Sequence, residues 1–248
     1  MSIQNDKELK GILKVGQFVG KLRDLLMEKS KVGISTFALD QMAKVIFENS
    51  GALSAPKHDY KFPGYTCISV NHEIAHGIPS REQILKDGDL VNIDVSAKLD
   101  GFYADTGISF IVGESSDQKL RHLCEVAKLG TEAAINVAHT GNLLRHLGRE
   151  IQQTANRNGF NVIKNLAGHG TGRKLHEEPE VLVYENKRDK RTLTSGLVLA
   201  IESFVSTGST MAVELSDGWT LSTLDKSYVA QCEHTVIVMD GQAIVATR

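Results

Sequence analysis

The sequence predicts a mixed α/β domain in which helical segments and strands alternate twice along the chain. Two helical segments come first and strands follow, and the second half repeats this outline. In each half, acidic residues interrupt apolar β-type segments. With 248 residues, 41% of them hydrophobic and 23% charged, the chain is long enough to bury a substantial core. No linker rich in proline and glycine separates the halves, so we expect one domain over residues 1–248.

The first half opens with two helical segments. Apolar residues at helical spacing predict helices from about 6 to 30 and from about 36 to 49. Ser35 is a suitable N-cap for the second helix, and Gly51 is a suitable stop after it. A short strand is expected at 67–70.

The segment 90–112 is predicted to form a β-hairpin closed by a two-residue Asp-Gly turn. In that register Asp105 lies opposite Ser96, and Asp94 shares their face because side chains alternate along a strand. The two aspartates then form a diagonal pair with Cβ atoms about 7 Å apart. Two carboxylates this close repel each other in an apolar setting unless a proton or cation lies between them. A divalent metal is one interpretation, and an exposed, solvated sheet face is the other.

The second half repeats the order of helices and strands. Helices are expected from about 117 to 138 and from 142 to 158. Strands are expected near 160–163, at 197–206 and at 230–240. The last two each carry a glutamate within an apolar run, as the hairpin carries its aspartates.

Acidic residues inside β-type segments are the candidate metal ligands: Asp94, Asp105, Glu202 and Glu233. The stretch NLAGHGTGRKLHEEPEV, residues 165–181, adds His169 and His176. Oxygen ligands with one imidazole suit Mn, Fe, Co or Zn. Four carboxylates exceed the need of one ion, so we expect two divalent cations bridged by carboxylates. For His169 taken alone, a loop histidine without a ligand role is the alternative.

Charge and cysteine content exclude several classes of protein. Lys and Arg total 28 against 30 Asp and Glu, so no general basicity favours nucleic acid or anionic lipid, and we read the basic run at 187–191 as a solvated loop. No apolar stretch approaches the length of a membrane span, and the N-terminus lacks a signal peptide. The three cysteines have no CxxC spacing. We expect a soluble, cytoplasmic protein without nucleic-acid specificity.

Five motifs resemble, in order, those of type I methionine aminopeptidases of the short bacterial form: CISVNHEIAHGIPS, LVNIDVSAKLDGFYADTGISF, GHGTGRKLHEEPEV, LVLAIES and AQCEHTVIV. The resemblance covers nearly the whole chain. It implies the pseudo-twofold pita-bread fold, with a curved antiparallel sheet covered by helices, which agrees with the repeated halves. It also implies removal of the initiator methionine from deformylated nascent chains whose second residue is small. The partners would be these nascent chains, with a transient ribosome contact at most, and the enzyme would be a monomer.

The resemblance assigns roles to the acidic residues. Asp105 and Glu233 would bridge the two metals. Asp94 would hold one metal, and His169 with Glu202 would hold the other. Glu202 is also the candidate proton shuttle.

The resemblance further assigns residues that contact the substrate. His76 and His176 match the family's two histidines that do not bind metal; His176 would donate to the intermediate or to the substrate carbonyl, and His76 would contact the next amide. Five positions match the pocket for the methionine side chain: Tyr60, Phe62, Cys67, Leu175 and Trp219. Aromatic and thiol groups suit a polarisable thioether. Ordinary core packing is the alternative for each of them except Trp219.

Departures from the family pattern leave all five ligands in place. Ser203 stands where proline commonly follows the glutamate, Ala75 where a cysteine is frequent, and His72 where an acid is frequent. Two alternatives stay open: an X-Pro peptidase of the same fold, and a binding protein that has kept the fold without catalysis. Only about 60 residues precede the first motif, whereas X-Pro relatives carry a large N-terminal domain, and non-catalytic relatives lose ligands.

Overall fold

A computed structural model describes residues 1–114 and 117–248. The helices are α1 (Asp6–Lys29), α2 (Thr36–Ser50), α3 (Ala55–Tyr60), α4 (Gln118–Asn136) and α5 (Arg145–Arg157). The strands are β1 (Leu53–Ser54), β2 (Cys67–Val70), β3 (Glu73–Ala75), β4 (Leu90–Leu99), β5 (Phe102–Ile111), β6 (Asn161–Val162), β7 (Ala167–Gly170), β8 (Glu177–Leu182), β9 (Val198–Ser206), β10 (Val213–Glu214), β11 (Leu221–Ser222), β12 (Val229–Ile237) and β13 (Ile244–Val245). Within these described ranges, no helix is both long and apolar enough to cross a membrane.

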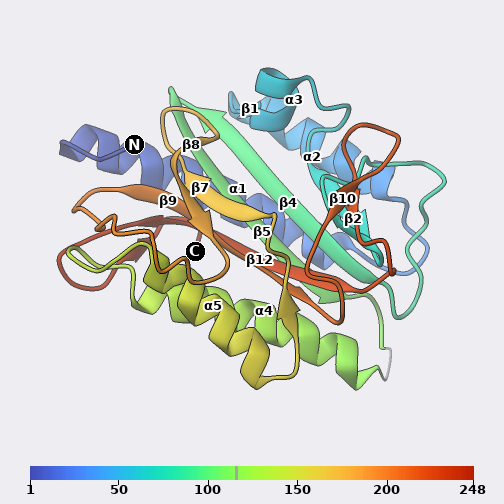
Figure 1. The fold of residues 1–248 in the computed structure, drawn as a ribbon. Helices are drawn as coiled ribbons and strands as arrows, with labels where there is room; N and C mark the ends of the chain where they lie inside the picture. The colour runs from blue at the N-terminus through green and yellow to red at the C-terminus, as the bar shows by residue number, and fades with distance from the viewer. Residues whose placement is uncertain (115–116) are drawn as a thin grey trace.

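Strands from both halves of the chain build one antiparallel sheet. Its ten strands follow the order β1-β4-β5-β12-β9-β7-β8, while β2 pairs with β4, β6 with β9 and β13 with β12. A second sheet has the order β10-β11-β3. The hairpin β4–β5 of the first half therefore lies beside β12 and β9 of the second half (Figure 1). The mixed fold with an antiparallel sheet confirms the architecture predicted from the alternating segments.

Helices α1 and α4 pack on one face of this sheet, and the acidic residues point to the other face. Arg23 of α1 donates to the hydroxyl of Thr106 on β5 at 2.6 Å, and Ser203 on β9 donates to a backbone carbonyl of α4 at 2.8 Å. Because side chains alternate along a strand, the preceding residues Asp105 and Glu202 point away from the helices. Their face of the sheet is therefore free to form a site.

The predicted ends of the second helix are confirmed. The side chain of Ser35 accepts a hydrogen bond from the backbone N–H of Ala38 at 3.1 Å. The helix stops at Gly51, which has φ +74, a conformation that glycine adopts without steric cost. The short elements α3, β1, β3, β7, β8, β10, β11 and β13 were not predicted, because two to six residues carry no readable periodicity.

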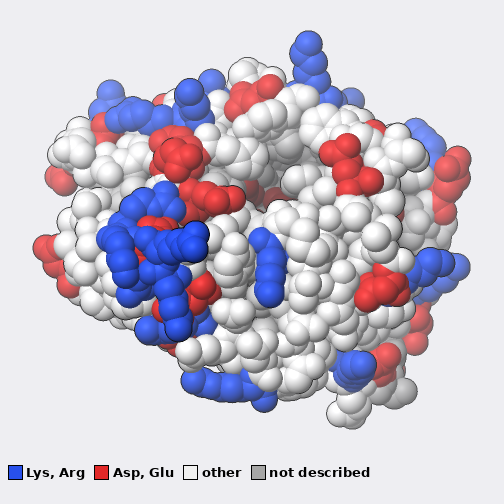
Figure 2. Space-filling model, in the orientation of Figure 1, with Lys and Arg blue, Asp and Glu red and all other residues white. Residues whose placement is uncertain are grey.

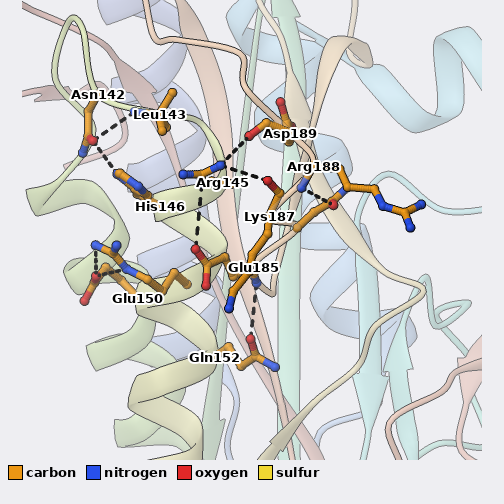
Figure 3. Close-up of polar contacts among 12 residues, drawn as sticks. Asn142, Leu143, Arg145, His146, Glu150, Gln152, Glu185, Lys187, Arg188 and Asp189 are labelled. Carbon is orange, nitrogen blue, oxygen red and sulfur yellow. Dashed lines mark hydrogen bonds and ion pairs between the residues drawn. The ribbon is translucent and has the colours of Figure 1, made fainter.

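The start of α5 differs from the prediction, since the helix begins at Arg145 and not near residue 142. Asn142 remains in the preceding loop, where its amide donates to the carbonyl of Val137 at 2.7 Å and its oxygen contacts His146 Nδ1 at 2.6 Å (Figure 3). The side chain of Asn142 thus stabilises a turn, which residues of this type favour over a helix interior.

The basic run at 187–191 is fixed to α5 through its backbone (Figure 3). Arg145 donates to the carbonyl of Lys187 at 3.0 Å and to that of Asp189 at 3.3 Å. Asp189 in turn accepts from Arg191 at 2.7 Å. Lys187 and Arg188 are exposed, in agreement with the solvated loop expected from the sequence.

Candidate metal centre

A cavity of about 840 Å³ opens on the face of the sheet opposite α1 and α4. Figure 2 shows this face, hollowed near its middle with acidic side chains at the edge of the hollow. The lining includes all five predicted metal ligands, both predicted active-site histidines and Gln231: Asp94, Asp105, His169, Glu202, Glu233, His76 and His176. Residues separated by more than a hundred positions in the chain therefore share one cavity.

The hairpin β4–β5 has the register expected from its Asp-Gly turn. Asp105 pairs with Ser96, and Asp94 pairs with Gly107, so the two aspartates are diagonal neighbours. Ser96 donates to Asp105 Oδ1 at 2.7 Å, and the backbone N–H of Asp105 donates to the hydroxyl of Thr235 at 2.8 Å. The solvated alternative is wrong for Asp105, because only 5% of the residue is exposed.

Two glutamates face each other across the second strand pair. Glu202 on β9 and Glu233 on β12 are directly paired, and 6% and 1% of their surfaces are exposed. Burial raises the pKa of Glu202 to about 7. Burial, together with the charges of Asp105 and Glu202, raises the pKa of Glu233 well above its usual value. Like charges in direct cross-strand register destabilise a sheet, so this pair needs a compensating positive charge.

The pKa values of the two aspartates shift in opposite directions. Burial, followed by the charges of Asp105 and Glu202, raises the pKa of Asp94 well above its usual value. Burial also acts to raise the pKa of Asp105, but hydrogen bonding and charge from His169 outweigh it and leave that pKa lowered. Of the four acids, Asp105 is thus the one held in its charged form.

His169 directs its Nε2 toward the acids. Its Nδ1 lies 2.9 Å from the carbonyl of Gly170, which can only accept, so Nδ1 carries the proton of the neutral ring. Nε2 lies 3.7 Å from Asp105 Oδ2, and it carries the second proton of the charged ring. Burial acts to lower the pKa of His169, but hydrogen bonding and charge from Asp105 outweigh it and leave that pKa raised. The lone pair of Nε2 is available to a metal once that proton has left. Ligand atoms of Asp105, His169 and Glu233 all lie within 4.8 Å of one another. This set of carboxylate oxygens and one imidazole fits a divalent transition metal.

Gln231 is a residue of the site that the sequence interpretation missed. Its amide nitrogen donates to Glu202 at 3.0 Å and to Glu233 at 3.3 Å, and its oxygen accepts from Asn92 at 2.7 Å. The amide therefore presents only its donor side to the two carboxylates. Since Gln231 stands two positions before Glu233 on the same strand, the period of two along β12 was the signal that could have found it.

Both predicted active-site histidines line the cavity. His76 follows β3 with φ +55, a left-handed conformation that is strained for a residue with a side chain, and burial lowers its pKa. The ring of His176 lies 4.4 Å from that of His169. Burial, followed by the charge of His169, lowers the pKa of His176 to about 4. His176 is therefore neutral at physiological pH.

The five positions predicted for the methionine pocket are dispersed around this centre. Phe62 and Trp219 pack edge to face at 5.2 Å, Cys67 pairs with Asp94 in the sheet, and Leu175 is buried in a small apolar cluster. Tyr60 is 45% exposed, and its hydroxyl contacts His176. None of these five lines the cavity described above, so a methionine pocket built from them stays a prediction.

Comparisons with known proteins agree with the motifs. The model of metallopeptidase family M24 matches residues 10–240. The methionine aminopeptidase of Staphylococcus epidermidis is 47% identical over 249 residues, spanning 100% of this chain and 99% of that protein. Methionine aminopeptidase 2 of Bacillus subtilis is 45% identical over 100% of both chains. The crystal structure of methionine aminopeptidase from Thermotoga maritima matches with a TM-score of 0.95 and 34% identity over 100% of both chains. The predicted resemblance and the pita-bread fold are confirmed.

Proposed function

The chain belongs to metallopeptidase family M24, and we propose that its acidic cavity is the metal centre with which it removes N-terminal methionine from peptides. It is an aminopeptidase of the methionine-specific kind. One observation supports this site above all others. Five candidate donors, brought from β4, β5, β7, β9 and β12, line a single cavity.

Two divalent cations are the proposed cofactors. Asp105 and Glu233 would be shared by the two ions, Asp94 would hold one of them, and His169 with Glu202 would hold the other. When bound, the cations supply an activated water, polarise the scissile carbonyl and accept the lone pair of the substrate's α-amine. Mn, Fe, Co and Zn all suit these ligands, and availability selects among them.

Glu202 also has a proposed role in proton transfer, and the two histidines that do not bind metal contact the substrate. Glu202 is the proposed proton shuttle, because a carboxyl with a pKa near 7 both takes and gives a proton at neutral pH. His176, neutral at that pH, donates a hydrogen bond to the oxygen of the reacting carbonyl. His76 contacts the amide beyond the scissile bond.

The proposed substrates are nascent chains that have lost the formyl group and carry a small second residue. The second residue passes over a floor of packed strands, which leaves little room for a long side chain. The methionine side chain enters a pocket formed by Tyr60, Phe62, Cys67, Leu175 and Trp219. We propose that the enzyme works in the cytoplasm as a monomer, contacting the ribosome only transiently, and that residues 1–248 act as one catalytic domain.

Neither alternative function is favoured. The relatives named methionine aminopeptidase match from end to end, and every candidate ligand required for catalysis is present.

Release of methionine from short peptides tests the proposal. The protein is freed of metal with a chelator, reloaded with Mn, Co, Fe or Zn, and given Met-Ala-Ser, Met-Lys-Ser and Ala-Pro-Ser. We expect release from Met-Ala-Ser with at least one metal, and little from the other two. Cleavage of Ala-Pro-Ser alone would favour an X-Pro peptidase, and no cleavage with any metal would favour a binding protein.

A further inference from the structure

Tyr60 makes a contact that a pocket for an apolar side chain does not require. Its hydroxyl oxygen lies 2.7 Å from Nδ1 of His176, and the two ring centroids are 5.4 Å apart. Tyr60 is the last residue of α3, and the chain turns sharply after it because Lys61 has φ +62. The C-terminal end of α3 thus places the phenol of Tyr60 against His176.

The direction of this hydrogen bond follows from the chemistry of the two groups. Burial and the nearby charge of Asp59 raise the pKa of Tyr60, so the phenol keeps its proton. A neutral imidazole has one bare nitrogen, and Nδ1 of His176 is the nitrogen that faces the phenol. A phenol is a better donor than a neutral imidazole N–H, and the bare imidazole nitrogen is the better acceptor. In the described part of the chain, the hydroxyl of Tyr60 makes no other hydrogen bond that would take its proton elsewhere.

A donor on Nδ1 fixes which nitrogen of His176 carries hydrogen. If Nδ1 accepts from Tyr60, the proton of the neutral ring must sit on Nε2. The contact also opposes rotation of the ring, which would exchange a nitrogen for a carbon. His176 lines the cavity beside His169. The contact with Tyr60 therefore fixes the orientation of a ring that already lies in the site.

We propose that Tyr60 is a positioning residue, which donates to Nδ1 of His176 and so holds its Nε2–H ready for the oxygen of the substrate carbonyl. This inference rests on the donor role proposed for His176 above. It gives Tyr60 a function in turnover, in addition to its predicted place in the methionine pocket. The two functions differ in their kinetics, because a pocket residue acts on binding and a positioning residue acts on the chemical step.

The variant Tyr60→Phe removes only the hydroxyl and keeps the ring. Loss of one hydrogen bond to the donor should lower kcat about tenfold while KM for Met-Ala-Ser stays within about twofold. Tyr103→Phe is the matched control, because it removes a nearby tyrosine hydroxyl that contacts Asp59 and not His176. Both kinetic constants of that control should stay within about twofold of wild type.

A double-mutant cycle with His176→Ala tests whether Tyr60 acts through the histidine. If it does, adding Tyr60→Phe to His176→Ala should change kcat by less than about twofold. A further loss as large as in the wild-type background would overturn the proposal, and so would a rise in KM without a fall in kcat.

Nitrogen NMR provides a readout that does not depend on activity. In zinc-loaded protein labelled with ¹⁵N-histidine, we expect His176 to show a protonated Nε2 and a hydrogen-bonded, bare Nδ1. Its signals are identified by their loss in His176→Ala. In Tyr60→Phe the Nδ1 signal should move and a population with protonated Nδ1 should appear. A wild-type spectrum with protonated Nδ1, or an unchanged spectrum in Tyr60→Phe, would contradict the inference. Absence of methionine release by wild type would instead defeat the proposed function, and the NMR result would still stand.

Discussion

At the scale of single residues, the acids of the cavity depend on neighbours that donate hydrogen bonds to them. Ser96 donates to Asp105, and Gln231 donates to both Glu202 and Glu233. These donors fix the directions of the carboxylates before any metal binds, as outer partners of metal ligands do. They do not offset the cost of burying these groups, since burial still raises the pKa of Glu202 to about 7.

Replacing Asp105 by asparagine tests the bridging role. The carboxylate with the lowered pKa would become a neutral amide, which cannot bridge two cations. We expect Asp105→Asn to abolish methionine release and the rise in Tm that added Mn produces in wild type. Methionine release and Tm are both measured on protein that a chelator has freed of metal and that is then titrated with Mn.

Asp100→Asn is the matched control on the same hairpin. Asp100 lies at the exposed tip with φ +52, a conformation that asparagine tolerates, and its partner is Lys14. This control should keep turnover and the metal response. An Asp105→Asn protein that also kept both would exclude Asp105 as a ligand.

The sequence predicted the residues whose position depends on local register, and it missed those that depend on tertiary contacts. The Asp-Gly turn alone sets Asp105 opposite Ser96. The contact between Tyr60 and His176 joins residues 116 positions apart, and no local pattern encodes it. Likewise, no local pattern predicts that the ring of His72 lies against that of Tyr228, with centroids 4.7 Å apart.

At the scale of elements, β9 is held to α4 by the residue that departs from the family pattern. Ser203 is fully buried, donates to the carbonyl of Ala127 at 2.8 Å and lies 3.1 Å from the hydroxyl of Thr131. Thr131 also donates to the carbonyl of Cys232 on β12 at 2.7 Å. A pair of hydroxyls thus connects one helix to both strands that carry glutamates, so the serine at this position ties β9 to α4.

Ser203→Ala should therefore affect stability and leave catalysis intact. Removal of one buried hydrogen bond should lower the free energy of unfolding by about 1 kcal/mol, measured by urea denaturation. Because Ser203 faces the helix, kcat and metal affinity should stay within about twofold. A large loss of metal affinity without loss of stability would show that Ser203 acts on the site directly.

Long elements were predicted well because they contain several repeats of the apolar spacing that is typical of a helix or a strand. The first two helices, the β4–β5 hairpin and strands β9 and β12 appear within a few residues of their predicted bounds. The three-stranded sheet β10-β11-β3 was missed, because strands of two or three residues are defined by their partners and not by their own sequence.

At the scale of the whole molecule, the buried acids make the metal-free fold sensitive to pH. The pKa of Glu202 rises from 4.5 to about 7 on folding, so the folded protein binds more protons than the unfolded chain between these values. The free energy of unfolding must then fall as the pH rises through this window. Bound metal replaces the protons and removes the effect.

The free energy of unfolding of metal-free and metal-loaded protein, measured between about pH 5 and pH 8, tests this linkage. We expect the metal-free protein to lose stability as the pH rises, and the metal-loaded protein to lose less. In metal-free Glu202→Gln the free energy of unfolding should change less steeply with pH, because the glutamine amide does not titrate. An equal slope in wild type and Glu202→Gln would mean that other groups control the dependence.

Recognition of the free amine of an N-terminal methionine by the metal centre can be tested with a pair of peptides. Met-Ala-Ser and formyl-Met-Ala-Ser share the scissile bond, the methionine side chain and the small second residue, and they differ in the lone pair of the amine. We measure methionine or formylmethionine released by the metal-loaded protein. We expect rapid release from the free peptide and none from the formylated one. Equal rates for the two peptides would contradict this recognition.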